Sequence, residues 1–253
     1  MPEVCVVVPC YNEARRLRGA DFIAFLDAHP EATLCLVDDG SRDATRAMLG
    51  ALRDERPGRI LVLELAPNGG KAEAVRAGVR HACSQGPWPI LGYWDADLST
   101  PLSEVDRLLA PFAGDAGLQL ALGSRVKRLG SHIERRVARH ILGRLFAACA
   151  SVVLGLSVYD SQCGAKLFRR EMVAVFFGDP FLTRWLFDLE ILARLRNAVG
   201  ITAMQAAREV PLAEWREVGG SKLGLREMGG VPLELLRIRK HYNARTPSPS
   251  SRP

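Results

Sequence analysis

Residues 90–97 of the chain read Ile-Leu-Gly-Tyr-Trp-Asp-Ala-Asp, an apolar run that ends in two alternating acids. Such a run predicts a buried strand whose carboxyl end opens into a site. Residues i and i+2 of an extended segment point to the same side, so Asp95 and Asp97 can both reach one hard cation. Mg²⁺ or Mn²⁺ held in this way takes its other ligands from water and substrate phosphates. Because Asp-x-Asp also occurs in solvated turns, the interpretation depends on the rest of the chain.

Three further apolar runs precede this one, and helical patterns separate them. The predicted strands are Val4–Val8, Leu34–Val37, Ile60–Leu63 and Ile90–Tyr93, and the predicted helices are Ala14–Ala28, Asp43–Arg53 and Lys71–Ala82. This β-α-β alternation predicts an α/β fold with a mostly parallel sheet and helices on both faces. Ligands of such sheets bind at the carboxyl ends of the strands.

Polar or glycine-rich clusters follow all four predicted strands. They are Pro9-Cys10-Tyr11-Asn12-Glu13, Asp38-Asp39-Gly40-Ser41, Asn68-Gly69-Gly70-Lys71 and Asp95-Ala96-Asp97. Asp38 or Asp39 could hydrogen-bond a nucleotide base or ribose, or could belong to a turn with a helix cap. The third cluster could offer N–H groups and the Lys71 ammonium to a diphosphate, or could be a plain loop. Four such clusters together indicate a binding site.

The second half of the chain has a less regular pattern. It predicts a strand at Leu118–Leu122, a helix from about Ile133 to Leu154, a second helix at Leu186–Ala198, a strand near Ile201–Val210 and a disordered tail at 243–253. We expect a cytoplasmic protein, because the N-terminus lacks a signal-peptide pattern and the six cysteines form no CxxC pair. The longest uncharged apolar stretch, Leu145–Val158, is too short to span a bilayer.

The basic segment from Arg125 to Arg144 holds seven Arg or Lys residues and one acid. Its predicted helix mixes apolar residues with four arginines, Arg135, Arg136, Arg139 and Arg144. Such a helix could lie at an anionic membrane surface as a peripheral contact, or could pack on the core with a solvated basic face. We expect no nucleic-acid partner, because the segment lacks interleaved aromatic residues over most of its length and no recognised nucleic-acid motif is present.

The order of the motifs resembles that of the inverting family 2 glycosyltransferases, and within them the dolichyl-phosphate β-glucosyltransferase and dolichyl-phosphate mannose synthase branch. The resembling segments, from Val4 to Leu223, are VVVPCYNEARRL, LVDDGSRDAT, NGGKAEAV, YWDADLSTP, GSR, DSQCGAKLF, RWLFDLEIL and EVGGSKL. The resemblance implies a GT-A fold, in which a Rossmann-like nucleotide-binding half (1–114) is fused to an acceptor-binding half (115–242) as one continuous domain.

The resemblance also implies roles for individual residues. A nucleoside pocket would be lined by Pro9, Tyr11, Glu13 and either Asp38 or Asp39, with Lys71 near the nucleotide. Mg²⁺ or Mn²⁺ on the diphosphate would be bound by Asp95 and Asp97. Ser99 stands where relatives often have glutamine. The donor and acceptor phosphates would be surrounded by Arg125, Lys166 and Lys222. Asp188 and Glu190 match the acidic pair on the acceptor-side helix.

The implied reaction is a single displacement that moves a hexose from a nucleoside-diphosphate sugar to a polyprenyl or dolichyl phosphate. The sequences of residues 160–164 and 185–188 resemble the glucosyl branch more closely, which favours UDP-glucose over GDP-mannose as donor. A phosphate acceptor is already ionised near neutral pH and needs no base. A soluble or cell-envelope hydroxyl acceptor, which is the alternative, would need Asp188 or Glu190 as base. Both acids could instead cap a helix or pair with Arg184 or Arg194. A third hypothesis is a non-catalytic module that binds nucleotide sugars.

Overall fold

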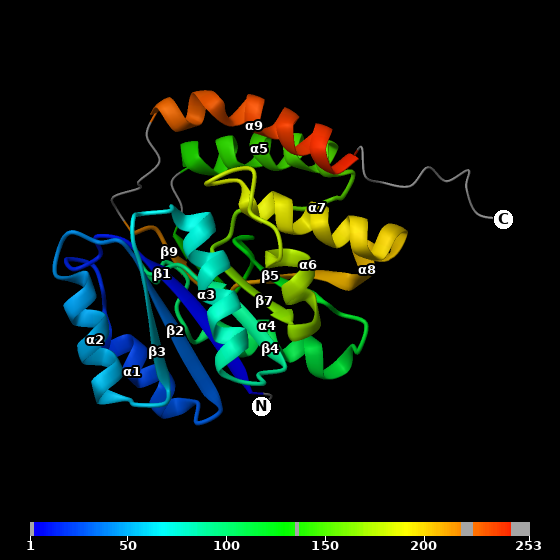
Figure 1. Ribbon diagram of the computed structural model, residues 1–253. Coiled ribbons are helices and arrows are strands. Elements are labelled where there is room, and N and C mark those ends of the chain that lie inside the picture. Colours follow the sequence, from blue (N-terminus) through cyan, green and yellow to red (C-terminus); the bar gives the residue numbers. More distant parts are fainter. Residues whose placement is uncertain (1–2, 135–136, 219–224, 244–253) are drawn as a thin grey trace.

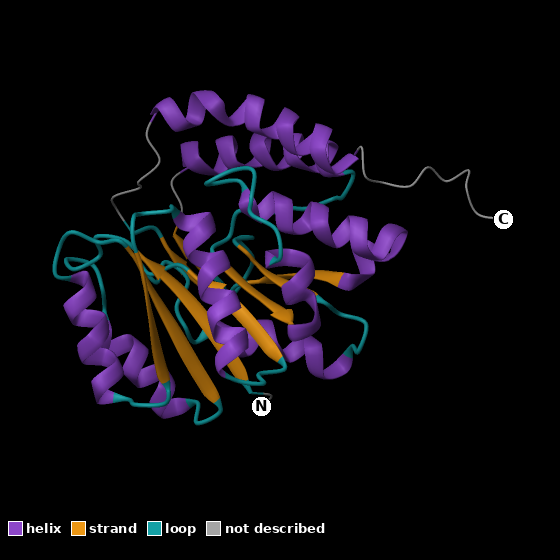
Figure 2. Cartoon of the chain, in the orientation of Figure 1, coloured by secondary structure: helices purple, strands orange, loops and turns teal. Residues whose placement is uncertain are grey.

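A seven-stranded sheet forms the centre of the computed structural model, which describes residues 3–134, 137–218 and 225–243 (Figures 1 and 2). The strands are β1 (Val4–Cys10), β2 (Ala32–Asp39), β3 (Ile60–Leu65), β4 (Ile90–Trp94), β5 (Leu120–Ser124), β7 (Ala165–Arg169) and β8 (Ala207–Pro211). Their order in the sheet is β3-β2-β1-β4-β7-β5-β8. Every pairing is parallel except those of β7, which runs antiparallel to β4 and β5.

Both faces of the sheet are covered, which explains why its strands are apolar along their whole length. Val4, Val6 and Val8 of β1 pack in one core with three helices, α1 (Gly19–Ala28), α2 (Thr45–Glu55) and α4 (Glu104–Gly114). Cys5 and Val7 point to the other face and pack in a second core with α3 (Lys71–Gln85), α6 (Val173–Phe177) and α7 (Phe187–Val199).

A further helical layer covers this second core. The helices α5 (Val137–Leu154) and α9 (Leu225–Asn243) lie side by side over α7 at the top of Figure 1. Leu154 and Ile238 are among the residues that these two helices bury there. None of the helices within the described ranges is both long enough and apolar enough to cross a bilayer.

The predicted α/β class and the predicted strands of the first half are confirmed. The first helix is shorter than predicted, because the Glu13 carbonyl accepts hydrogen bonds from the N–H groups of Arg16 and Leu17 and forms a turn before α1. Ile133 lies in a short strand, β6 (His132–Glu134), and not in a helix, because it pairs with Trp215 of β9 (Glu214–Arg216).

Other parts of the second half also differ from the prediction. Residues 200–206 form two short helices, η2 (Gly200–Thr202) and α8 (Ala203–Ala206), and the predicted strand begins only at Ala207. A 3-10 turn, η1 (Arg170–Met172), follows β7. The sequence pattern indicated none of α4, β7 and α9. The predicted disordered tail beyond Asn243 lies outside the described residues. The division into a nucleotide-binding half (1–114) and an acceptor-binding half (115–242) stays a prediction. Strands β5, β7 and β8 of the second half continue the sheet of the first half.

Candidate active site

A cavity of about 610 Å³ lies at the carboxyl ends of β1, β2 and β4 and brings together most of the predicted site residues. The predicted residues that line it are Pro9, Tyr11, Glu13, Asp39, Lys71, Asp95, Asp97, Arg125 and Asp188. Parallel strands β1, β2 and β4 deliver their loops to one edge of the sheet, which is why segments far apart in the sequence meet here. Antiparallel β7 begins at the same edge, and the segment before it closes one side.

The acidic pair after β4 sits in a fixed turn. The indole N–H of Trp94 donates to the Thr100 carbonyl (2.7 Å), and the Ser99 N–H donates to Oδ1 of Asp97 (3.0 Å). Burial raises the pKa of Asp97, and the neighbouring charge of Asp95 raises it further. A carboxylate whose ionisation is opposed in this way favours a cation beside it.

Lys71 supplies one cation at this place. Its Nζ lies 2.5 Å from Oδ1 of Asp95. Burial tends to lower the pKa of Lys71, but the carboxylates of Asp95 and Asp188 raise it above its ordinary value. The ammonium is therefore held charged at the first residue of α3, and the amino-terminal end of a helix also favours an anion.

The oxygen donors of Asp95 and Asp97 fit Mg²⁺ or Mn²⁺, which prefer carboxylate and phosphate oxygens. Within the described ranges, no group of three or more His, Cys, Asp or Glu side chains could hold a metal ion. A divalent ion at the acidic pair would therefore depend on substrate phosphates and water for its remaining ligands.

Gly164 allows Asp95 to take its position. The Asp95 N–H donates to the Gly164 carbonyl (2.9 Å), and a Cβ added at Gly164 would lie 1.9 Å from Oδ2 of Asp95. No real side chain can approach a carboxylate so closely, so the carboxylate or the backbone would have to move.

We expect Gly164→Ala to lower the affinity for a nucleotide–metal complex by about tenfold or more, since it displaces a carboxylate of the acidic pair. The measurement is calorimetric titration with UDP in the presence of Mn²⁺. Gly117→Ala is the matched control, because a Cβ there meets only Oδ1 of Asp115 at an ordinary 3.4 Å. Equal affinities in the two variants would contradict the role given to Gly164.

The two acids at the end of β2 have different environments. Asp39 accepts hydrogen bonds from Nδ2 of Asn68 (2.8 Å) and from the N–H groups of Gly69 (2.8 Å) and Gly70 (2.9 Å). It thereby holds the glycine-rich loop that leads into α3. Asp38 is buried, accepts from the Ser41 N–H (3.1 Å), and does not line the cavity. Of the two alternatives, the structure brings Asp39 into the cavity.

A buried ion pair lies at the base of the cavity. Nζ of Lys166 is fully buried and lies 2.6 Å from Oδ1 of Asp188. It also donates to the Cys163 carbonyl (2.6 Å), and the Tyr93 hydroxyl donates to the same Oδ1 of Asp188. Lys166 therefore contacts Asp188 and does not itself line the cavity.

Arg125 is held in place by Asp160. Its Nε and Nη2 atoms donate to the two carboxylate oxygens of Asp160 (2.7 and 2.6 Å), and its guanidinium lies over the Trp215 ring. The carboxylate of Asp160 contributes to raising the pKa of Arg125, against the lowering effect of burial. Arg125 thus presents a permanent positive charge at the cavity wall.

Glu190 does not line the cavity. It is fully buried and accepts hydrogen bonds from residues 182, 183 and 242. Lys222 lies outside the described residues. Asn68, of the third polar cluster, lines the cavity as well. The structure also adds cavity residues to which the sequence analysis gave no binding role: Arg16, Gln162, Arg184, Trp185 and Trp215. Gln162 belongs to a quoted motif, and its Nε2 is buried with no hydrogen-bond partner among the described residues. Such an amide could donate to a ligand.

Comparison with known families gives a direct match for this architecture. The pattern described as "Glycosyl transferase family 2" matches residues 5–177, which include β1 to β4 and the acidic pair. The chain belongs to glycosyl transferase family 2. It is therefore a glycosyltransferase, and the predicted family is confirmed.

Curated family 2 relatives resemble the chain over most of its length. The dolichyl-phosphate beta-glucosyltransferase of Drosophila melanogaster is 34% identical, and the alignment covers 87% of this chain and 69% of the relative. The corresponding protein of Dictyostelium discoideum is 31% identical, with coverage of 94% and 74%. The human dolichyl-phosphate beta-glucosyltransferase is 29% identical, with coverage of 88% and 75%.

Solved structures confirm the predicted GT-A fold. Glucosyl-3-phosphoglycerate synthase from Mycobacterium tuberculosis, in complex with Mn²⁺, UDP and glucosyl-3-phosphoglycerate, superposes with a TM-score of 0.67. The sequences are 20% identical, and the match covers 99% of this chain and 82% of the other. A complex of the same enzyme with Mn²⁺ and UDP-glucose gives a TM-score of 0.65 at 19% identity, with coverage of 99% and 81%.

Proposed function

We propose that this family 2 glycosyltransferase transfers glucose from UDP-glucose to a polyprenyl phosphate such as dolichyl phosphate, with inversion at the anomeric carbon. The observation that carries the proposal is one cavity that joins the acidic pair, Asp95 and Asp97, to the cations Lys71 and Arg125. Relatives named dolichyl-phosphate beta-glucosyltransferase support the sugar and the acceptor. A similar fold that binds UDP-glucose with Mn²⁺ supports the donor and the metal.

The donor would lie with its diphosphate between the acidic pair and the start of α3. Asp95 and Asp97 would hold Mg²⁺ or Mn²⁺, which supplies Lewis-acid stabilisation of the charge that develops on the leaving diphosphate. Lys71 and the N–H groups at the start of α3 would stabilise the same charge. Pro9 near the end of β1, and Tyr11 and Glu13 just after it, would contact the nucleoside.

A phosphate acceptor suits the surroundings of Asp188 better than a hydroxyl acceptor. A hydroxyl must lose its proton to a base, and a proton placed on Asp188 would leave the Lys166 ammonium buried beside a neutral acid. A phosphate monoester is largely ionised near neutral pH and can attack without a base. Arg125 would position it through charge-assisted hydrogen bonds.

A polyprenyl phosphate lies in a bilayer, so the proposed reaction requires the cavity to approach a membrane surface. A peripheral contact at the cytoplasmic side of a membrane remains our proposal. The arginines predicted to make it (Arg135, Arg136, Arg139 and Arg144) fall outside the part of the chain whose side chains the structure describes.

The proposal is tested with matched acceptors. Purified protein, radiolabelled UDP-glucose and Mn²⁺ are incubated with dolichyl phosphate, with dolichol, or with 3-phosphoglycerate, and product is measured in the organic and aqueous phases. We expect label in the organic phase with dolichyl phosphate, and at least about a hundredfold less with dolichol, which lacks the ionised nucleophile. Transfer to dolichol, or to 3-phosphoglycerate alone, would favour the alternative with a hydroxyl acceptor. Donor binding without any transfer would favour the non-catalytic module.

A further inference from the structure

The segment 178–186 connects α6 to α7 and carries Arg184 to the wall of the cavity. Nη2 of Arg184 donates to Oδ1 of Asn68 (3.3 Å). Its guanidinium also lies against Gly70, where an added Cβ would be 2.7 Å from Nε. Arg184 therefore places a positive charge beside Gly70, the residue before Lys71 at the start of α3.

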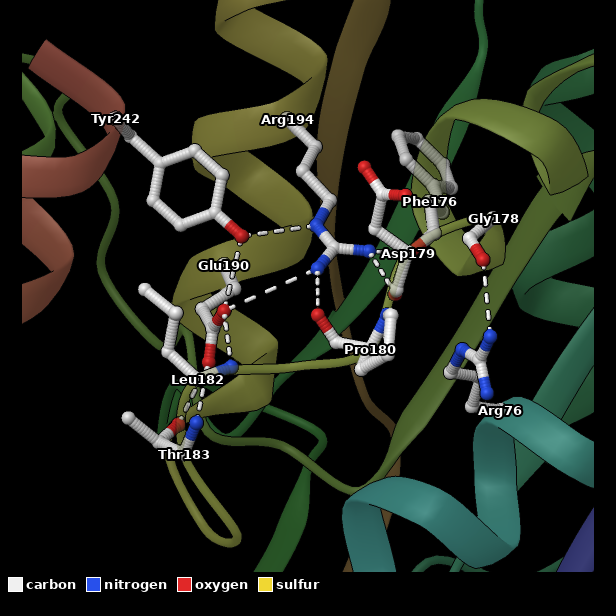
Figure 3. A network of polar contacts seen from close by, with 10 residues as sticks. All are labelled: Arg76, Phe176, Gly178, Asp179, Pro180, Leu182, Thr183, Glu190, Arg194 and Tyr242. Atoms are coloured by element: carbon white, nitrogen blue, oxygen red, sulfur yellow. Dashed lines mark hydrogen bonds and ion pairs between the residues drawn. The ribbon is translucent and has the colours of Figure 1, made fainter. Parts of the chain in front are cut away.

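Two side chains of α7 fix the backbone of this segment. Within the segment, Arg194 donates to the carbonyls of Asp179 through Nη1 and Pro180 through Nη2, both at 2.8 Å. Its Nη1 also donates to the Phe176 carbonyl in α6, just before the segment (2.8 Å). Glu190 accepts from the N–H groups of Leu182 and Thr183, both at 2.9 Å, and from the Thr183 hydroxyl at 2.8 Å. Figure 3 shows these contacts along the segment. They account for its course up to the residue before Arg184.

Tyr242 of α9 links the two α7 side chains. Its hydroxyl accepts from Nε of Arg194 (2.9 Å) and donates to Oε2 of Glu190 (2.9 Å). All three side chains are buried, so these hydrogen bonds are made in a low-dielectric environment, where each is strong and costly to lose. The last turn of α9 thereby acts on the segment through Glu190.

Helix α3 holds the other end of the segment. Nη2 of Arg76 donates to the Gly178 carbonyl (2.9 Å), and Arg76 lies on the same helix that begins at Lys71 (Figure 3). The segment is thus fixed between α3, whose first residues line the cavity, and α7, which carries Asp188. A loop held at so many backbone groups presents its next residue in one position.

We propose that Arg184 binds phosphate oxygens of a substrate, and that Glu190, Arg194 and Tyr242 are positioning residues that hold Arg184 at the cavity. The proposal rests on the proposed function for the identity of the substrates. The phosphate could belong to the donor diphosphate or to the acceptor, since both would carry phosphate oxygens into this cavity. Glu190, which the sequence offered with Asp188 as a possible base for a hydroxyl acceptor, takes a positioning role in this account.

The test compares five single variants, two of which serve as controls, for two constants. The first constant is the Kd for UDP with Mn²⁺ by calorimetry, and the second is the KM for dolichyl phosphate. Arg184→Gln should raise at least one constant by about tenfold, and Arg184→Lys should restore part of the loss, because a charge-assisted contact is removed and then partly replaced. Arg53→Gln, which removes an exposed charge of α2, should leave both constants within about twofold.

Tyr242→Phe tests the positioning role without removing a charge. It should raise the constant that Arg184→Gln raises, by about threefold or more, with kcat changed by less than about twofold. Asn243→Ala is the matched control, because it removes a different hydrogen bond between α7 and α9, the one from Nη2 of Arg196 (2.8 Å), which does not touch the segment. Thermal midpoints of both variants show whether each is folded.

A change in the UDP constant alone assigns Arg184 to the donor, and a change in the acceptor constant alone assigns it to the acceptor phosphate. If Arg184→Gln and Arg53→Gln have the same Kd for UDP and the same KM for dolichyl phosphate, Arg184 does not bind a substrate phosphate. If Tyr242→Phe and Asn243→Ala give the same values for both constants, Tyr242 does not position Arg184. The calorimetric measurement with UDP needs no acceptor. It therefore tests Arg184 even if the wild-type protein transfers no glucose to dolichyl phosphate, a result that would contradict the proposed function.

Discussion

Asp97→Asn is expected to lower kcat/KM for glucosyl transfer by about a hundredfold to a thousandfold. The substitution keeps the shape of the side chain and an oxygen that can accept from the Ser99 N–H. It removes one of the two negative charges proposed to hold the divalent ion. The measurement is the initial rate of transfer at several Mn²⁺ concentrations. Part of the loss should be recovered at high Mn²⁺, because the remaining carboxylate, Asp95, would still bind the ion weakly.

Loss of folding should not explain this effect. Burial and the charge of Asp95 raise the pKa of Asp97, so the folded state disfavours its ionised form near neutral pH. Removing the charge should therefore leave the thermal midpoint unchanged or raise it. Asp54→Asn, at an exposed position of α2, is the control and should keep the wild-type rate. An Asp97→Asn rate within about threefold of wild type would contradict the metal role.

Lys166→Met is expected to lower the free energy of unfolding by about 3–5 kcal/mol, the cost of leaving one member of a buried ion pair without its partner. Methionine is unbranched and apolar, so the packing of the side chain is largely kept. What is lost is the ammonium that contacts Asp188 and the Cys163 carbonyl. The measurement is urea unfolding, compared with Lys127→Met, an exposed lysine whose loss should change stability by less than about 0.5 kcal/mol.

A double variant separates the charge from the packing. Lys166→Met with Asp188→Asn removes both charges, and the amide oxygen can still accept from the Tyr93 hydroxyl. It should be more stable than Lys166→Met alone, since no uncompensated charge stays buried. A single Lys166→Met variant within about 1 kcal/mol of wild type would mean that the ion pair contributes little to stability.

The sequence predicted the strands that are apolar throughout, because β1, β2 and β4 are buried on both faces and each ends in a polar cluster. It could not predict β7. Its second residue is the buried Lys166, which is paired with Asp188, 22 residues further on in the chain. No local pattern reports this pairing. Likewise β6 depends on pairing with β9, about eighty residues away in the chain, and no local pattern reports such a pairing.

The same limit applies to the site. Side chains of neighbouring strand residues point to opposite sides, so only one of Asp38 and Asp39 could face the cavity, and the sequence did not say which. Asp188 and Glu190 are two apart on a helix and cannot face the same way, a signal that could have separated them once the helix was predicted. Arg184 lies in an irregular segment whose position is set by α3, α7 and α9, so no spacing rule could have found it.

The central claim is that the acidic pair and a divalent ion bind a nucleotide sugar in this cavity. Its most direct test is thermal unfolding with UDP-glucose or GDP-mannose, with and without Mn²⁺, for wild type and Asp95→Ala. We predict that UDP-glucose with Mn²⁺ raises the wild-type midpoint by about 5–10 °C at a donor concentration about 100 times Kd, and that the shift is lost without Mn²⁺ or in Asp95→Ala. A folded wild-type protein with no shift, or an equal shift in Asp95→Ala, would contradict the account.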